Sequence, residues 1–281
     1  MLKNCDNECE IDYQIECPKW WNLNLKECLR YKELFFFFAW RDIKIRYNQA
    51  ILGIAWALLQ PMTLMVIFSI FWSKAIKIDT GLPYPLFAYI GLIFWMLFSS
   101  GMTNSANSMI ENANIIKKVY FPRIIIPVSA VIVSIFDFTM TLILSPFLLL
   151  YYRVDLNIFK LLVLLPLSLI ITFTSSLGLG LILGSLNIKY RDFRYLIPFL
   201  LQSLFFLTPI FFPISILESN ALKTIISINP MVTAISLARC AVANEPVDWE
   251  ALFFWFFFSI FILIVGLFFF RKTEIDCADV L

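Results

Sequence analysis

The sequence predicts an all-α integral membrane protein with six transmembrane helices, an amphipathic helix at the membrane surface before them, and re-entrant half-helices before the last span. Of its 281 residues, 60% are hydrophobic and 15% are charged, whereas soluble domains are nearer half apolar and a quarter charged. The mean hydropathy is +0.83. Six apolar runs approach or exceed the roughly 20 residues that a helix needs to cross a bilayer. They cover residues 54–73, 86–103, 124–150, 156–184, 196–213 and 250–270.

The first 32 residues form a predicted cytosolic segment ahead of the apolar part of the chain. They lack the early apolar core of a signal peptide and hold Cys5, Cys9, Cys17 and Cys28. We expect reduced thiols there, with a zinc site as the alternative. The chain has no histidine, which removes the commonest general base and metal ligand. We therefore assign no catalytic residue and no metal ligand.

Residues 33–48 predict the amphipathic helix. Phe36, Trp40, Ile43 and Tyr47 recur at helical spacing and share one face, so the helix should lie in the membrane surface with that face down. Its flanking basic side chains can reach anionic headgroups, and Asp42 and Arg46 have the spacing of an ion pair. The helix is either a topology anchor or the place where a membrane-bound substrate enters. The residues assigned to it are Trp40, Arg41, Lys44, Arg46 and Tyr47.

Basic residues in the connections predict the orientation, because cytosolic loops carry an excess of lysine and arginine. We therefore place both termini in the cytosol and the protein in the cytoplasmic membrane. The predicted cytosolic set is Arg41, Lys44, Arg46, Lys117, Lys118, Arg123, Lys189, Arg191, Arg194, Arg271 and Lys272. The opposite, smaller set is Lys74, Lys77, Arg153, Lys160, Lys223 and Arg239.

The third and fourth spans are longer than a bilayer requires and should be tilted, broken or partly outside the bilayer. Pro127, Pro146 and Pro166 are the candidate kink points. Asp137 lies in the middle of the third span, where a carboxylate is costly and normally faces protein or a cavity. No lysine or arginine is predicted at its depth. We expect it to pair with a serine, threonine, asparagine or glutamine, or to be protonated, with a proton relay as the alternative.

Two connections on the predicted cytosolic side are candidates for contact with a partner protein. In residues 111–123, two isoleucines and a valine form an apolar stripe beside two lysines. A short helix of this kind fits a groove on a partner, and the alternative is a solvated turn. Residues 187–194 form the second connection. The residues assigned to the contact are Asn112, Ile115, Ile116, Lys117, Lys118, Val119 and Arg191.

Residues 214–249 form a connection too long for a simple turn. Short apolar pieces alternate there with Asn229, Pro230 and Thr233. We expect two half-helices that dip back into the membrane, where non-helical backbone is tolerated only when protein or water surrounds it. The alternative is a loop lying on the membrane surface.

Amides, hydroxyls and aromatic rings along the spans predict a path for an amphipathic solute, since weak contacts at many sites favour passage. Lipid-facing aromatic residues are the alternative for each ring. Gly180 and Gly184 have a spacing that predicts close helix packing. The residues assigned to the path are Trp56, Gln60, Asn104, Gln202, Phe205 and Thr208.

Four stretches resemble the permease subunits of polysaccharide ABC exporters, in the expected order over residues 33–281. They are WRDIKIRYNQAILGIAWALLQP (40–61), NANIIKKVYFPRIIIP (112–127), NIKYRDFRYLIPFLLQSLFFLTPIFFP (187–213) and FRKTEIDCADVL (270–281). The resemblance implies a half-transporter with six spans, a second copy beside it, and two copies of a separate ABC ATPase. It implies that residues 111–123 couple to the ATPase and that a lipid-linked glycan enters near the interfacial helix. It also implies that the re-entrant pieces of residues 214–249, with Asn229, Pro230 and Thr233, gate the outer mouth.

The sequence is consistent with a transport subunit that does not itself bind a nucleotide. No phosphate-binding loop is present, because none of the eight glycines precedes a lysine, so ATP and Mg²⁺ are expected on the partner. The net charge of +2 gives no sign of nucleic-acid binding. The alternatives are a small-molecule or drug exporter of the same broad family, a membrane-embedded glycosyl- or acyltransferase, and a proton-coupled carrier. The sequence does not identify the glycan.

Overall fold

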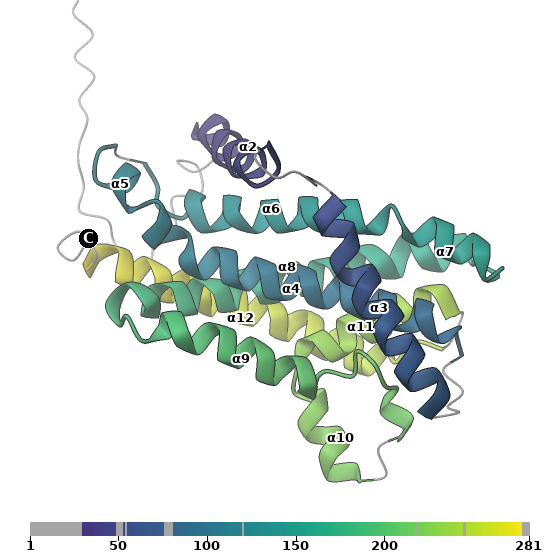
Figure 1. Ribbon diagram of the computed structural model, residues 1–281. Coiled ribbons are helices and arrows are strands. Elements are labelled where there is room, and N and C mark those ends of the chain that lie inside the picture. Colours follow the sequence, from purple (N-terminus) through teal and green to yellow (C-terminus); the bar gives the residue numbers. More distant parts are fainter. Residues whose placement is uncertain are drawn as a thin grey trace, which may run out of the picture.

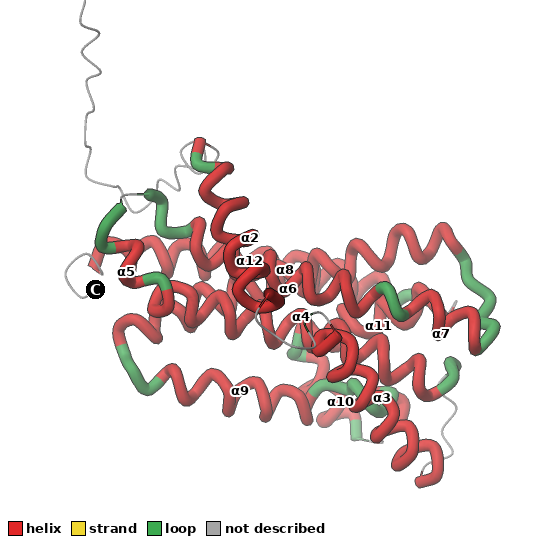
Figure 2. The backbone as a smooth tube through the Cα atoms, turned by 45° about the horizontal axis from the view of Figure 1, so that its top comes forward, coloured by secondary structure: helices red, strands yellow, loops and turns green. Residues whose placement is uncertain are grey.

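The computed structural model describes residues 30–48, 53, 55–75, 81–119, 121–216, 219–243 and 246–276. Within these ranges every regular element is a helix, which confirms the all-α prediction (Figures 1 and 2). The N-terminal half contains α2 (Lys32–Asn48), α3 (Ala55–Ala75), α4 (Tyr84–Glu111), α5 (Ala113–Ile116), α6 (Ile125–Leu142) and α7 (Ser145–Tyr151). The C-terminal half contains α8 (Ile158–Lys189), α9 (Phe193–Leu207), the 3-10 turn η1 (Ile214–Ile216), α10 (Asn220–Ser227), α11 (Pro230–Ala243) and α12 (Trp249–Asp276). The segment 1–29, with its four cysteines, lies outside the described residues.

Helices α4 and α8 form the centre of the bundle. α8 packs against α4, α11 and α12, and α4 packs against α3, α6 and α11 as well. α4 is apolar on nearly all sides over its first five turns, as a helix surrounded by others should be. Its Tyr89, Phe94 and Phe98 are fully buried. The Tyr89 hydroxyl donates to the carbonyl oxygen of Thr141 at 2.6 Å, which ties α4 to α6.

Four stretches of the described residues are long and apolar enough to cross a membrane: Tyr84–Glu111, Ile125–Tyr151, Ile158–Lys189 and Trp249–Glu274. The apolar stretches Ala55–Phe71 of α3 and Phe193–Leu207 of α9 are shorter. The architecture is therefore that of a multi-pass membrane protein, while six complete crossings stay a prediction. The third predicted span is broken, as expected, with Pro146 in the first turn of α7. Pro166 lies inside α8 without ending it.

The fifth predicted span, residues 196–213, is wrong at its C-terminal end, because α9 stops at Leu207. Fifteen helical residues rise about 22 Å, less than the roughly 30 Å of a hydrocarbon core. Thr208 is extended, with φ −86° and ψ 131°, and Pro209 follows it without an N–H to continue the helix. The chain then runs to η1 without helical hydrogen bonding.

The long connection does contain two short helices, as predicted, but they differ in burial. α11 lies inside the bundle and packs against α8, α4 and α12. α10 contacts α11 and projects below α9 and α11 (Figure 1). Their depth in the membrane stays a prediction.

Glycines bring α8 close to its neighbours on two sides. A Cβ atom on Gly180 would lie 2.6 Å from the Ser105 Cβ atom of α4, and one on Gly184 would lie 3.3 Å from backbone atoms of Ala106. The close packing predicted at these two positions is confirmed. A second contact was not predicted: Gly178 of α8 faces Gly266 of α12, and a Cβ atom on Gly266 would lie 2.5 Å from the Gly178 carbonyl oxygen.

Candidate functional site

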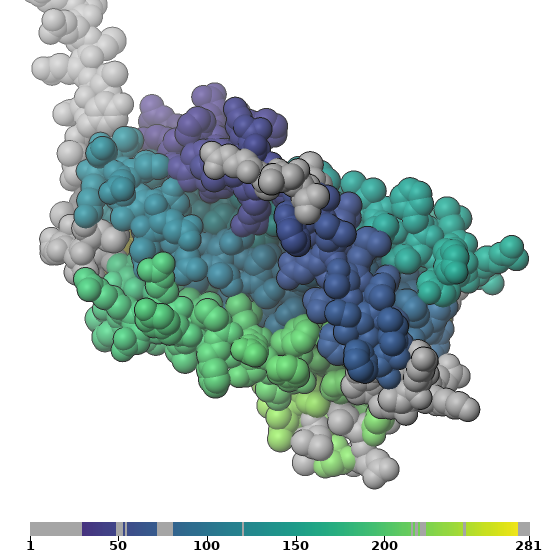
Figure 3. Space-filling view, viewed as in Figure 1, coloured from purple at the N-terminus to yellow at the C-terminus, as the bar shows by residue number. Residues whose placement is uncertain are grey.

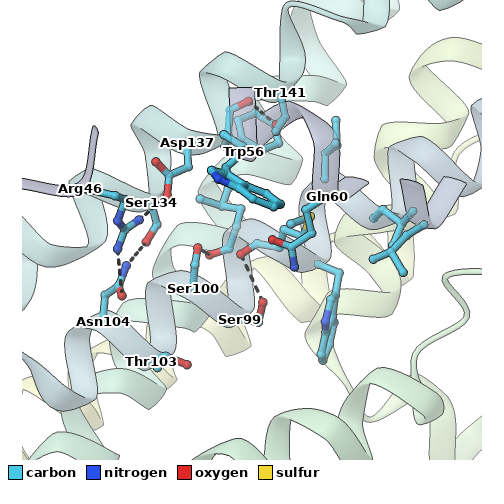
Figure 4. Close-up of a pocket in the computed structure, with 18 of the residues that line it drawn as sticks. Arg46, Trp56, Gln60, Ser99, Ser100, Thr103, Asn104, Ser134, Asp137 and Thr141 are labelled. Carbon is cyan, nitrogen blue, oxygen red and sulfur yellow. Dashed lines mark hydrogen bonds and ion pairs between the residues drawn. The ribbon is translucent and has the colours of Figure 1, made fainter. Parts of the chain in front are cut away.

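A cavity of about 750 Å³ lies between α3, α4, α6 and α9 and is lined on one side by the end of α2. We call it the main cavity (Figure 4). Its lining mixes small polar side chains with aromatic rings, and charged groups occur at one end only. The polar residues are Gln60, Ser99, Ser100, Thr103, Asn104, Ser134 and Thr141, and the aromatic ones are Trp56, Trp95, Phe138 and Phe205, with Tyr47 at the charged end.

The charged end of the main cavity is built from α2 and α6. The Arg46 guanidinium and the Tyr47 hydroxyl both donate to the Asp137 carboxylate. Arg46 also reaches the Asn104 side-chain oxygen at 3.4 Å. Asn104 in turn donates to the Ser134 hydroxyl at 2.9 Å. Figure 4 shows this group gathered at one end, with Trp56 and Gln60 farther along.

Two sequence-based expectations about these charges are wrong. Asp137 pairs with an arginine and a tyrosine of α2, although no basic residue was expected at its depth. Arg46 therefore turns to α6, and Asp42 pairs instead with Arg41, at 2.6 Å. The physical reason is that α2 packs on α6 rather than lying apart from the spans. Desolvation by burial, followed by the hydrogen bond to Asp137, raises the pKa of Tyr47, so its hydroxyl stays protonated and donates.

Helix α2 forms where it was expected, but the predicted single apolar face is wrong, because its apolar side chains are spread around the helix. Phe38 and Ala39 are buried against the bundle. Phe36 and Trp40 stack on each other, with ring centroids 6.4 Å apart, and remain exposed on the outer surface. Lys44 is exposed beside them. Figure 3 shows α2 lying across the outside of the other helices.

A second concavity lies under α2 and has a volume of about 610 Å³. We call it the α2 groove. It is lined by Arg41, Asp42, Ile45, Arg46, Asn104, Ser108, Glu111, Asn112, Asn114, Ile115, Ala130 and Val133. The Arg41 guanidinium donates to the Asn112 side-chain oxygen at 2.7 Å. Because Asn112 connects α4 to α5, this bond joins α2 to the segment assigned to partner contact.

The residues assigned to the path divide into two groups. Trp56, Gln60, Asn104 and Phe205 line the main cavity. Gln202 is exposed and Thr208 is buried, and neither lines it. Thr208 instead has a structural role, because its hydroxyl donates to the Leu204 carbonyl at 2.7 Å and accepts from the Asn229 side-chain amide at 2.8 Å.

The predicted apolar stripe of residues 115–119 is wrong as a single surface. Ile115 and Ile116 pack against the protein's own apolar cluster around Phe38 and Phe121. Val119 is 56% exposed, and Lys117 and Lys118 are exposed beside it. The isoleucines thus anchor the segment, and the surface left for a partner is basic. Arg191 is exposed in the turn from α8 to α9, at the same end of the bundle as α5 (Figure 1).

Of the residues assigned to the outer gate, Asn229 contacts the end of α9. The Asn229 side-chain oxygen accepts from the Met231 backbone N–H at 3.0 Å, which caps α11, while its amide holds Thr208. Pro230 begins α11 and is buried. Thr233, one turn later, is also buried.

Arg239 is a residue that the sequence analysis misplaced. It was counted among the basic residues of an external connection, yet it lies in α11 with 8% of its surface exposed. Its guanidinium lies 3.4 Å from the centroid of the Phe87 ring and donates to the Phe87 carbonyl. It also donates to the carbonyls of Pro209 and Ile210, at 2.9 and 2.6 Å.

Residues 33–242 match the family described as ABC-2 type transporter. A protein of Klebsiella pneumoniae named O-antigen export system permease protein RfbA is 29% identical over 244 residues, which cover 86% of this chain and 92% of that protein. A protein of the same name from Myxococcus xanthus is 27% identical over 214 residues, with 75% and 81% covered. A polysialic acid transport protein KpsM of Escherichia coli is 25% identical over 244 residues, with 83% and 91% covered.

Proposed function

The chain belongs to the ABC-2 type transporter family, and from this we propose that it is the transmembrane subunit of an ATP-driven exporter of a lipid-linked polysaccharide. The cargo is of the O-antigen, capsule or teichoic-acid type, and the membrane is the cytoplasmic one, with both termini in the cytosol. The similarity to permeases named for O-antigen and polysialic acid transport, over more than three quarters of each relative, supports this assignment.

The main cavity is the single structural observation that carries the proposal. Sugar rings present apolar faces and hydroxyl edges, and the cavity offers aromatic rings beside amides and hydroxyls. Many weak contacts of this kind let a polymer slide, because no single site binds it too tightly to leave. A second copy of the chain facing the cavity would complete the conduit. The exposed apolar side chains of α3 and α9 support that arrangement, with Trp56 and Phe206 at 59% and 70% exposure.

Reconstitution tests the function. The chain and its ATPase, placed together in liposomes, should move a lipid-linked glycan across the bilayer when ATP is added. The chain alone should hydrolyse no ATP. Transport of a small hydrophobic drug in place of the glycan would favour the broader exporter class. Glycan transport by the chain without any ATPase would refute the proposal.

Charge reversal at Lys118 should weaken binding to the ATPase by about tenfold, because a lysine exposed at the rim of an interface acts through electrostatic complementarity. Co-purification of the ATPase with a Lys118→Glu chain at low and high salt measures the effect. Lys223→Glu, a reversal in α10, which projects from the lower side of the bundle well away from α5, is the matched control (Figure 1). Equal recovery of the ATPase with both variants would remove residues 117–119 from the contact.

A further inference from the structure

The main cavity and the α2 groove are separate spaces that meet at one place. Both are lined by Arg46 and by Asn104. Along α4, the residues that line the main cavity all lie between Leu92 and Asn104, and those that line the groove lie between Asn104 and Asn112. Asn104 is therefore the boundary on this helix.

Helix α6 shows the same boundary from the other side. Ala130 and Val133 line the α2 groove, whereas Ser134, Asp137 and Phe138 line the main cavity. The two helices thus change from one space to the other at the level where Asn104 donates to Ser134. Arg46 crosses this level from α2 and reaches both Asp137 and Asn104.

We propose that Arg46, Tyr47 and Asp137 form a latch that closes the main cavity from the α2 groove. When the two α2 side chains leave Asp137, the spaces join into one polar passage from the protein surface to the cavity. That this passage carries a glycan from the cytosol rests on the proposed function. The latch itself rests only on where the two spaces are separated.

The ion pair has the properties that a reversible closure needs. The side chains of Arg46 and Asp137 are 39% and 23% exposed, so neither is sealed in the core. A charge-assisted bond between such groups holds the closed form without making it permanent. Tyr47 adds a second bond and packs its ring 5.7 Å from that of Phe136.

The latch is also connected to the segment that contacts the ATPase in the proposed function. Arg41 lies in the same helix as Arg46 and bonds Asn112 at the start of α5. The apolar residues of α5 share a cluster with Phe38 of α2. A displacement of α5 therefore pulls on α2, whose far end carries the latch.

Thiol labelling tests the latch without any glycan. A cysteine at Ser100, which lines the main cavity, is introduced into a chain whose six native cysteines are changed to serine. Inside-out vesicles containing the full transporter are treated with a charged, membrane-impermeant methanethiosulfonate. Asp137→Asn and Arg46→Gln should each raise the labelling rate about tenfold, the effect expected for loss of a charge-assisted hydrogen bond. Tyr47→Phe should give a smaller rise.

The reagent's charge separates opening from a change in local potential. The two substitutions alter the charge of the site in opposite directions, so a purely electrostatic effect would speed a cationic reagent in one variant and slow it in the other. An open latch speeds cationic and anionic reagents alike in both variants. Lys32→Gln, which removes a charge from the exposed start of α2, is the control and should leave the rates unchanged.

Each outcome decides the proposal. Unchanged rates in both variants, opposite responses to the two reagents, or the same acceleration in the Lys32→Gln control would each overturn it. If Asp137→Asn does not assemble, Arg46→Gln and Tyr47→Phe still provide the test. A transporter that moves no glycan but shows the labelling pattern would retain the latch and lose the proposed cargo. A transporter that moves glycan but shows no change in labelling would retain the proposed cargo and lose the latch.

Discussion

Replacing Arg239 with methionine should destabilise the folded protein by about 3 kcal/mol or more, since each buried carbonyl left without a donor costs about 1–3 kcal/mol. The guanidinium donates to the carbonyls of Phe87, Pro209 and Ile210. The last two lie where α9 has ended, so no helical N–H follows to bond them. In an apolar bilayer, broken backbone of this kind is tolerated only when protein satisfies it.

The same segment has a second side-chain donor, which sharpens the expectation. The Tyr84 hydroxyl donates to the Phe211 carbonyl at 3.1 Å. The segment 209–211 is thus held by side chains from α4 and α11. Loss of Arg239 removes the donors to the Pro209 and Ile210 carbonyls, while the Tyr84 bond to the Phe211 carbonyl remains. Arg239→Lys should be intermediate, because a single ammonium does not reproduce the planar fork that reaches several carbonyls.

Heating in detergent followed by size-exclusion chromatography measures the change in melting temperature. Arg194→Met is the matched control, since Arg194 is exposed on α9, and it should melt with the parent protein. The expected order of stability is parent, then Arg239→Lys, then Arg239→Met. If Arg239→Met and Arg194→Met had the same melting temperature, the Arg239 guanidinium would not hold the segment 209–211.

Adding one methyl group at Gly178 should also be costly, by about 2 kcal/mol, because small-to-large changes in a packed interior force backbones apart. A Cβ atom there would lie 2.8 Å from the backbone nitrogen and Cα atom of Leu263. These are backbone atoms of α12, so the clash cannot be relieved by a change of side-chain rotamer. The helix pair α8–α12 must separate or tilt to admit the methyl group.

Gly184→Ala is the matched control for Gly178→Ala in the same helix. A Cβ atom at Gly184 would lie 3.3 Å from its nearest neighbours, and alanine favours the helix by up to about 1 kcal/mol over glycine. The Gly184 variant should therefore be near neutral while the Gly178 variant loses stability. Melting curves of the purified proteins compare them, and equal melting temperatures would mean that α8 and α12 do not approach as closely as described.

The membrane class, the helices and the break at Pro146 were predictable because each depends on local features. Apolar runs of sufficient length form helices in a bilayer whatever their neighbours are, and a proline interrupts a helix wherever it removes the N–H and crowds the preceding turn. The end of α9 was missed by several residues. Its apolar run continues past Thr208, and hydropathy does not register that Pro209 ends the hydrogen bonding.

The site was predicted in its residue types and only partly in its arrangement. Trp56, Gln60, Asn104 and Phe205 come from three different helices and line one cavity, which their composition suggested. Gln202 has the same chemistry and is exposed on another face of α9. Helical spacing orders the faces of one helix, but it does not say which face meets which neighbour.

The sequence by itself determined that the chain is helical, apolar and multi-pass, because those properties follow from the composition and spacing of each segment. Only the tertiary structure decided which partners its charged side chains meet. Asp137 meets Arg46 across 91 positions of sequence, and Arg239 meets Phe87 across 152. A charge in an apolar interior must find a partner because leaving it alone costs too much, and that partner is set by which helices pack side by side.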